Sequence, residues 1–388
     1  MKKKYLILIV FPILLTAVFF ACSKSDDDEA TYIPDIKKSP VSVDLTKVPY
    51  PKLSDYKFFS GDMKEQKPAL NVLPYLPSSP LFTDYAHKKR FVWMPVGTKA
   101  TYNGDGNILE LPVGAVLIKT FYYDNVQNVT PVGATRIVET RIMIRKSDGW
   151  IFADYVWNTE QTEAYFDLAG SITPITWKDD NDVIQSADYK IPTEVQCIVC
   201  HKSQHLEDNG TLTTKHIPIG IKPQNLNWNY NYPTGPKNQL TQWIDKGYLK
   251  NNFSLPSAAN TAIDYNDVTK SLELRARSYF DSNCSHCHMN DRHCDYRPMR
   301  FAFNETGLPN GQGLTNMGVC VPTQDMQDFP SALSTIVKPG NIERSMLYYR
   351  LNTTDESYRM PLHGRTMIHT EGVALIEQWI NSMTDCPQ

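Results

Sequence analysis

The sequence predicts a multi-domain α+β fold, in which an N-terminal antiparallel β domain precedes two mostly α-helical segments. Two patterns carry this prediction. Apolar and polar residues alternate with a period of two between about residues 51 and 191, and helical periodicity takes over only after that point. A chain of 388 residues is also long enough for two or three hydrophobic cores.

The β domain is expected at residues 51–191, and the segment 136–146 shows the alternation most clearly. One face of this segment carries Val138, Thr140, Ile142 and Ile144. The other face carries Glu139, Arg141 and Arg145, as in a half-buried strand. Aromatic and β-branched runs at 111–123 and 150–157, bounded by Gly, Asn and Asp turns, indicate further strands.

Two helices are expected in the C-terminal part. Residues 267–281 have helical periodicity with Asp267 as the N-cap, and residues 371–383 present an apolar stripe that includes Trp379. These helices should cross and pack together. Leu-Thr-Gln-Trp-Ile at 240–244 is nearly repeated at 376–380, which indicates an internal duplication.

The N-terminus has the layout of a secretory signal peptide at residues 1–21. Three lysines precede an apolar stretch that is too short for a typical membrane-spanning helix. Ala21 and Cys22 resemble a bacterial lipobox, so Cys22 is expected to be lipidated and to anchor the chain, with residues 22–50 as a polar tether. We therefore expect an exported outer-membrane lipoprotein that faces the periplasm or the cell surface. An uncleaved anchor or a soluble secreted protein is the alternative.

Charge argues against a nucleic-acid partner. Lys and Arg number 39 against 42 Asp and Glu, for a net charge of −3. No long cationic run follows the first four residues, so the basic surface that a phosphate backbone requires is not indicated.

The strongest chemical signal is a Cys-x-x-Cys-His motif that occurs twice. The first motif consists of Cys197, Cys200 and His201, and the second of Cys284, Cys287 and His288. Two thiols about one helical turn apart can form thioethers with the vinyl groups of one haem, and the adjacent imidazole can bind its iron. We therefore expect two covalently bound haem c groups. Zinc sites, disulfides and redox-active dithiols are the alternatives.

Each iron also needs a sixth ligand, and Met360 is the expected one for the second haem, opposite His288. Pro361 favours an extended conformation at Met360 on a loop before the last helix, and a thioether ligand raises the reduction potential. The alternative is that Met360 only fills the core. No Met lies between the two motifs, so His216 is the candidate for the first haem, with an open or weakly ligated iron as the alternative.

Three further cysteines remain, at positions 294, 320 and 386. Two of them can pair in an oxidising compartment. Cys294 with Cys320 is the preferred pair, because it would close a loop with little secondary structure beside the second haem. Cys386 would then be free.

The segment 267–383 resembles the class I c-type cytochromes, with a helix, a Cys-x-x-Cys-His motif, a Met-Pro loop and a final Trp-containing helix. The mature chain resembles a group of exported bacterial di-haem proteins with a β-rich N-terminal half. The residues that carry this second resemblance are 80–85, 112–121, 139–141, Trp150, 218–220, 238–240 and 339–340. The resemblances imply a first, reduced cytochrome c-like segment at 192–262 and a second cytochrome c-like domain at 263–388.

Electron transfer between redox partner proteins of the cell envelope is the function that these features favour. An enzyme is the alternative, in which an open first haem reduces a small oxidant as a peroxidase does. No side chain is singled out as catalytic. A third hypothesis makes the β domain a binding module for a protein or glycan.

Overall fold

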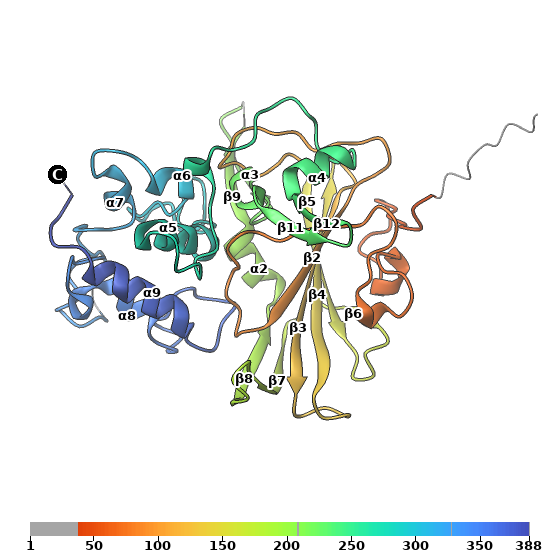
Figure 1. The fold of residues 1–388 in the computed structure, drawn as a ribbon, viewed down its shortest axis with the longest axis horizontal. Coiled ribbons are helices and arrows are strands. Elements are labelled where there is room, and N and C mark those ends of the chain that lie inside the picture. The colour runs from red at the N-terminus through yellow and green to blue at the C-terminus, as the bar shows by residue number, and fades with distance from the viewer. Residues whose placement is uncertain (1–37, 208, 327, 388) are drawn as a thin grey trace, which may run out of the picture. The chain divides into compact units, whose positions relative to one another are not determined.

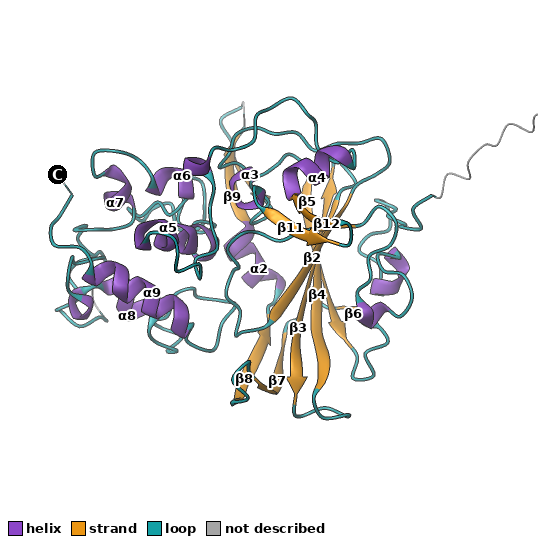
Figure 2. Ribbon diagram, viewed as in Figure 1, coloured by secondary structure: helices purple, strands orange, loops and turns teal. Residues whose placement is uncertain are grey.

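A large antiparallel β-sheet in the N-terminal part is followed by a C-terminal part with several short helices, which confirms the mixed α+β character (Figures 1 and 2). The computed structural model describes residues 38–207, 209–326 and 328–387. The expected signal peptide at 1–21, the lipidation site at Cys22 and the first part of the tether lie outside the described residues.

The sheet has eight strands, and every pair of neighbours is antiparallel. The strands are β1 (Leu73–Pro74), β2 (His87–Trp93), β3 (Val116–Val126), β4 (Ala134–Lys146), β5 (Gly149–Trp157), β6 (Ala164–Phe166), β7 (Ser171–Lys178) and β8 (Ile184–Ile191). The order is β1-β2-β3-β4-β5-β6, while β7 pairs with β8 and with the end of β3. The alternating segments therefore form strands, as expected.

One face of the sheet is covered by the N-terminal segment of the described chain. Val48, Tyr56 and Phe58 are buried in one cluster with Ile118 and Ile142 of the sheet. The short 3-10 helices η1 (Leu53–Tyr56) and η2 (Met63–Glu65) belong to this segment. The tether expectation is thus wrong for residues 38–50, because apolar side chains at 41, 43, 45 and 48 pack against the core instead of facing solvent.

The part after the sheet contains helices and two hairpins. These elements are α2 (Glu194–His201), β9 (Lys202–Leu206), β10 (Leu212–His216), α3 (Pro223–Leu226), β11 (Asn229–Tyr232), β12 (Gly235–Asn238), α4 (Gln239–Asp245) and η3 (Ala258–Asn260). The expectation of a mostly helical segment at 192–262 is therefore wrong. Thr213 and Thr214 favour extended backbone, and β10 pairs with β9 along its whole length.

The C-terminal helices are α5 (Leu272–Asn283), α6 (Phe303–Thr306), α7 (Gln312–Asn316), η4 (Ile342–Arg344), α8 (Met346–Leu351) and α9 (Thr370–Asn381). Apart from α6, these helices contribute residues to one hydrophobic cluster. The packing of α5 on α9 is confirmed, with the rings of Phe280 and Trp379 centred 5.4 Å apart. Helix α5 begins later than expected, because Ser271 caps it while Asp267 closes a separate turn with Thr269.

The two near-copies around Trp243 and Trp379 both form helices, but their surroundings differ. Trp243 of α4 lies against Tyr75 in a cluster that includes residues of the sheet, with ring centroids 5.8 Å apart. Trp379 of α9 instead packs on α5. The repeated sequence therefore does not extend to a repeated helix pair.

The disulfide of the described chain joins Cys320 to Cys386, with Cα atoms 5.8 Å apart. The expected pairing of Cys294 with Cys320 is wrong, and Cys294 is a buried thiol. The physical reason is the path of the chain end. Gly340 donates a backbone hydrogen bond to Ile380 of α9, while Cys320 donates one to Val337, so both cysteines are drawn to the same strand-like segment.

A buried ion pair joins α5 to the segment that follows the first motif. The carboxylate of Asp281 accepts hydrogen bonds from Lys222 Nζ at 2.7 Å, Asn225 Nδ2 at 2.8 Å and the Phe303 amide at 3.0 Å.

Contacts group Ser39–Gln388 into one unit, so the expected boundaries near 191 and 262 are changes of secondary-structure type within it. Among the described residues, no helix is both long enough and apolar enough to cross a membrane.

Replacing Asp281 by Asn should destabilise the protein by about 3–5 kcal/mol, because it leaves the buried Lys222 amine without a counter-charge. Chemical denaturation of the purified chain measures this change. Asp245→Asn is the matched control, since Asp245 pairs with Lys237 on the surface and its loss should cost less than about 1 kcal/mol. Equal effects of the two substitutions would contradict the role assigned to Asp281.

Proteolysis of the purified protein without reductant should yield one linked peptide pair that contains Cys320 and Cys386. Mass spectrometry before and after reduction identifies the pair. Cys294 should react with an alkylating reagent only after unfolding, because the folded chain leaves it 5% exposed. A peptide linking Cys294 to Cys320 would overturn the pairing.

Candidate functional site

The first motif lies at the end of helix α2. Thr193 caps this helix, and a reciprocal capping box with Gln196 fixes its first turn. The helical geometry places Cys197 and Cys200 about one turn apart. His201 follows, and its Nδ1 lies 2.7 Å from the carbonyl oxygen of Ile217. With Nδ1 donating to that carbonyl, Nε2 is the nitrogen left for a metal, as is usual for ligating histidines.

His216, the candidate sixth ligand of the first haem, ends β10 directly before Ile217, whose carbonyl oxygen contacts His201 Nδ1. The ring of Phe152 packs against both imidazoles, and His216 Nδ1 lies 3.3 Å from the Trp150 carbonyl oxygen. The sequence positions of His201 and His216 could not reveal that both imidazoles pack against Phe152, because the β9–β10 hairpin reverses the chain direction between them.

The second motif follows helix α5 directly. Cys284 forms the C-cap of α5, and its carbonyl oxygen accepts the amides of Cys287 and His288 at 3.1 and 3.0 Å. His288 is buried and packs edge-on to Phe301, with centroids 5.6 Å apart. Its Nδ1 is buried without a hydrogen-bond partner in the described part of the chain. Packing, rather than a hydrogen bond, therefore orients this imidazole.

Burial is the largest cause of the pKa shifts of both motif histidines and of the first cysteine of each motif. It lowers the pKa of His201 to about 4 and that of His288 to about 3, so both imidazoles are neutral near pH 7. A neutral imidazole is the form that binds a metal. Burial raises the pKa of Cys197 and of Cys284 to about 12, so these thiols are protonated rather than reactive thiolates.

The two motifs meet in space. The ligand atoms of Cys200, His286 and Cys287 all lie within 4.8 Å of one another. Cys200 comes from the first motif, whereas His286 and Cys287 come from the second, 86 and 87 positions further along the chain by their numbers. This contact had no sequence signal, because it depends on how α5 docks against the segment after α2. Its chemistry also fits three ligands of a single metal ion.

Each motif borders its own cavity. The cavity beside Cys197 and His201 has a volume of about 580 Å³, and the cavity beside Cys284 and His288 about 250 Å³. Four residues line both cavities: Cys200, His286, Pro361 and His363. The two cavities therefore adjoin where the motifs meet.

The structure places Met360 in the second cavity, together with Cys284, Cys287 and His288. Its backbone is held on both sides. The Met360 amide donates to the Arg350 carbonyl at 2.8 Å, and Arg365 Nε donates to the Met360 carbonyl at 3.1 Å. The expected distal ligand and the proximal histidine thus line one cavity.

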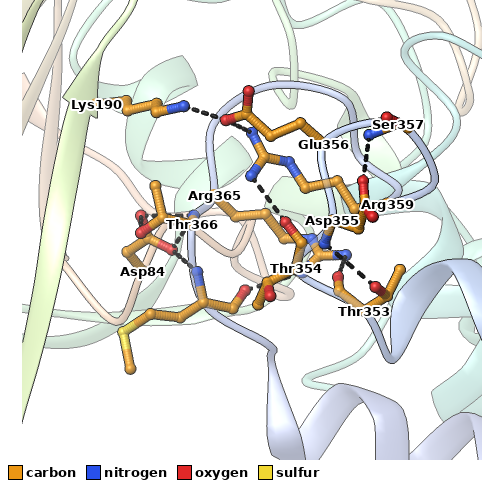
Figure 3. Close-up of polar contacts among 11 residues, drawn as sticks. Asp84, Lys190, Thr353, Thr354, Asp355, Glu356, Ser357, Arg359, Arg365 and Thr366 are labelled. Carbon is orange, nitrogen blue, oxygen red and sulfur yellow. Dashed lines mark hydrogen bonds and ion pairs between the residues drawn. The ribbon is translucent and has the colours of Figure 1, made fainter.

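The loop around Met360 is tied to the β region by a polar network (Figure 3). Asp84 accepts hydrogen bonds from the amides of Thr366 at 2.7 Å and Met367 at 2.8 Å. Lys190 at the end of β8 pairs with Glu356, which also accepts from Arg359 at 3.1 Å. Asp84 belongs to the conspicuous segment 80–85, so a role of that segment is to position the Met360 loop.

Comparison of the chain with protein-family models, curated proteins and solved structures finds no match. What the two cavities hold must therefore be argued from their own residues. These residues are the paired thiols and neutral imidazoles of the motifs, the Met360 loop, and the three side chains at which the motifs meet.

Proposed function

We propose that this chain binds two c-type haems covalently and transfers electrons between redox partner proteins at the bacterial cell envelope. The observation that carries the proposal is the meeting of the two Cys-x-x-Cys-His motifs at Cys200 and Cys287. Each motif has a cavity of its own, and the cavities adjoin. Two groups attached in this way would lie close together, as electron transfer between them requires.

The donor set suits haem attachment at both motifs. Each pair of thiols would form two thioethers, and His201 or His288 would supply the fifth ligand of the iron. The contact from His201 to the Ile217 carbonyl supports this role, because it leaves one ring nitrogen for the metal. The pairing of α5 with α9 supports the class I cytochrome c-like character of the second segment.

Met360 is proposed as the sixth ligand of the second haem. It shares a cavity with His288, and its loop is held through Arg350, Arg365 and Asp84. A thioether ligand favours the reduced iron, so the second haem would have the higher potential. Electrons would then pass from the first site to the second before leaving the protein.

Location at the envelope is part of the same proposal. A secretory leader at 1–21 and a lipid on Cys22 would hold the mature chain at the outer membrane, facing the periplasm or the cell surface. The Cys320–Cys386 disulfide supports export, because such bonds persist in oxidising compartments.

A peroxidase-like enzyme is the second candidate function, and the difference between the cavities favours it. The first cavity is the larger, at about 580 against 250 Å³. His216 Nδ1 lies 3.3 Å from the Trp150 carbonyl oxygen, and His216 is not among the described residues that line this cavity. An open iron there could meet a small oxidant while the second haem supplies electrons.

The double substitution Cys197→Ala, Cys200→Ala should remove one of two haems. The pyridine haemochrome spectrum per mole of protein and the intact mass measure the change. Cys294→Ala is the matched control, because Cys294 is a buried thiol outside both motifs and should leave two haems in place. Unchanged haem content in the double variant contradicts the first attachment site. Stoichiometric zinc in a haem-free chain would favour a metal site at Cys200, His286 and Cys287 instead.

Met360→Leu should lower the reduction potential of one haem and allow its ferrous iron to bind carbon monoxide. Redox titration and optical carbon monoxide titration measure both effects. Met346→Leu is the control, since Met346 is another thioether on the same cavity and should change neither. One equivalent of carbon monoxide bound by the unsubstituted protein would support the enzyme function, and a Met360→Leu variant identical to wild type would remove Met360 from the iron.

A further inference from the structure

A row of charged side chains crosses the sheet beside the first motif. Arg90 of β2 lies directly opposite Lys119 of β3, Lys119 lies opposite Arg141 of β4, and Arg141 lies opposite Asp154 of β5. Directly opposed residues have Cβ atoms about 4.5–5.5 Å apart on one face of a sheet. All four residues line the first cavity, together with Cys197 and His201. The row is therefore part of the wall of the candidate site.

Apart from Lys88 and Glu139, the neighbours of this row on the same face are apolar. On one side of the row, Leu117 lies two positions from Lys119 and Met143 two positions from Arg141, and both belong to one buried cluster. On the opposite side, Phe121 lies two positions from Lys119 and belongs to a second buried cluster. Arg90 is itself only 7% exposed. Like charges directly opposed in a sheet destabilise it, and a buried charge is costly unless it is paired. Three adjacent basic residues thus require compensation.

Among the described residues, carboxylates lie within ion-pair distance at only one end of the row, beside Arg141. Arg141 donates to Glu139 with a distance of 2.8 Å from Nε to Oε2, and Asp154 lies 3.8 Å from the same nitrogen. Burial and the adjacent Glu139 raise the pKa of Asp154 well above its ordinary value. The carboxyl groups that accompany the row thus gather at its Arg141 end.

At the other end of the row, neither Arg90 nor Lys119 has an ion-pair partner within 4.0 Å in the described part of the chain, and Glu139 acts on Lys119 only from a longer distance. Arg90 Nη1 is buried and has no hydrogen-bond partner. The Lys119 amine packs over the Phe121 ring, 4.6 Å from its centroid, and no carboxylate of the described residues pairs with it. Burial, with Arg90 and Arg141 alongside, lowers the pKa of Lys119 well below its ordinary value. An anion bound between Arg90 and Lys119 would supply a counter-charge to both groups and a hydrogen-bond acceptor to Arg90.

We infer that Arg90 and Lys119 form a binding site for a carboxylate or a small oxoanion in the first cavity. The guanidinium offers parallel N–H groups and the amine offers a point charge, which together suit two oxygens of one planar or tetrahedral anion. Two sources share this chemistry. One is a propionate of a haem attached at Cys197 and Cys200, which rests on the proposed function, and the other is a free small anion that enters the cavity.

Calorimetric titration with sodium phosphate and with sodium acetate tests the site and separates the sources. The full exported protein and its Cys197→Ala, Cys200→Ala variant are titrated side by side. Binding to the full protein identifies a free anion as the ligand. Binding to the double variant alone identifies the haem propionate, because its loss vacates the site. Binding to neither protein overturns the inference. The absorbance spectrum separately reports whether haem is present, so a haem-free chain that binds phosphate disproves only the proposed function.

Substitutions identify the residues. Lys119→Met and Arg90→Gln should each weaken anion binding about 10- to 100-fold, the effect of losing a hydrogen bond to a charged group. Lys146→Met is the matched control, because Lys146 ends β4, carries the same charge and does not line the cavity. Equal affinities of the Lys119 and Lys146 variants would remove Lys119 from the site.

A second measurement covers the case in which the double cysteine variant does not fold. The single variant Lys119→Met should fold at least as stably as wild type, because methionine suits an apolar wall. If Lys119 holds a propionate, Lys119→Met should lower the midpoint potential of one haem, since a positive charge beside the iron is lost. Lys146→Met should not. No binding of phosphate or acetate by the full protein, together with unchanged potentials in Lys119→Met, contradicts both sources.

Discussion

The buried carboxylate of Asp281 is the constraint on which the arrangement of the two motifs depends. Asp281 lies in α5, three residues before Cys284. Its carboxylate accepts hydrogen bonds from Lys222 and Asn225 of the segment that follows the first motif. Because all three groups are buried, α5 can dock only where every one of them finds its partner. The same docking brings Cys287 against Cys200. A single ion pair thus links the fold of the β-rich half to the geometry of the candidate site.

Elements that depend on local pattern were predictable. The alternation in 136–146 becomes β4 because a period of two places alternate residues on one face of a strand. The apolar stripe of 371–383 becomes α9 because a period of 3.6 places its apolar residues on one side of a helix. The start of α5 shows where local rules stop being decisive. Both Asp267 and Ser271 can cap a helix, and only the packed structure selects Ser271.

Features that depend on what covers a surface could not be predicted. The polar side of β4 looks the same in sequence whether it faces water or a cavity, yet Glu139 is fully buried. The segments that bury it come from far along the chain, as do the partners of Cys320 and the position of His216. Residue spacing contains no information on such long-range contacts, which is why the disulfide was assigned wrongly.

The asymmetry of the two cavities has one structural origin. The second cavity is walled by residues of the C-terminal part, among them Met360, apart from Val199 and Cys200 of α2. The first cavity has the sheet as one wall, and its charged row comes from β2, β3, β4 and β5. A sheet that served only to bind a partner would not need a buried Arg90 and a half-buried Lys119 on this face. Under the proposed function, the β region is therefore a component of the first redox site, and differences in chemistry between the two sites arise from the sheet.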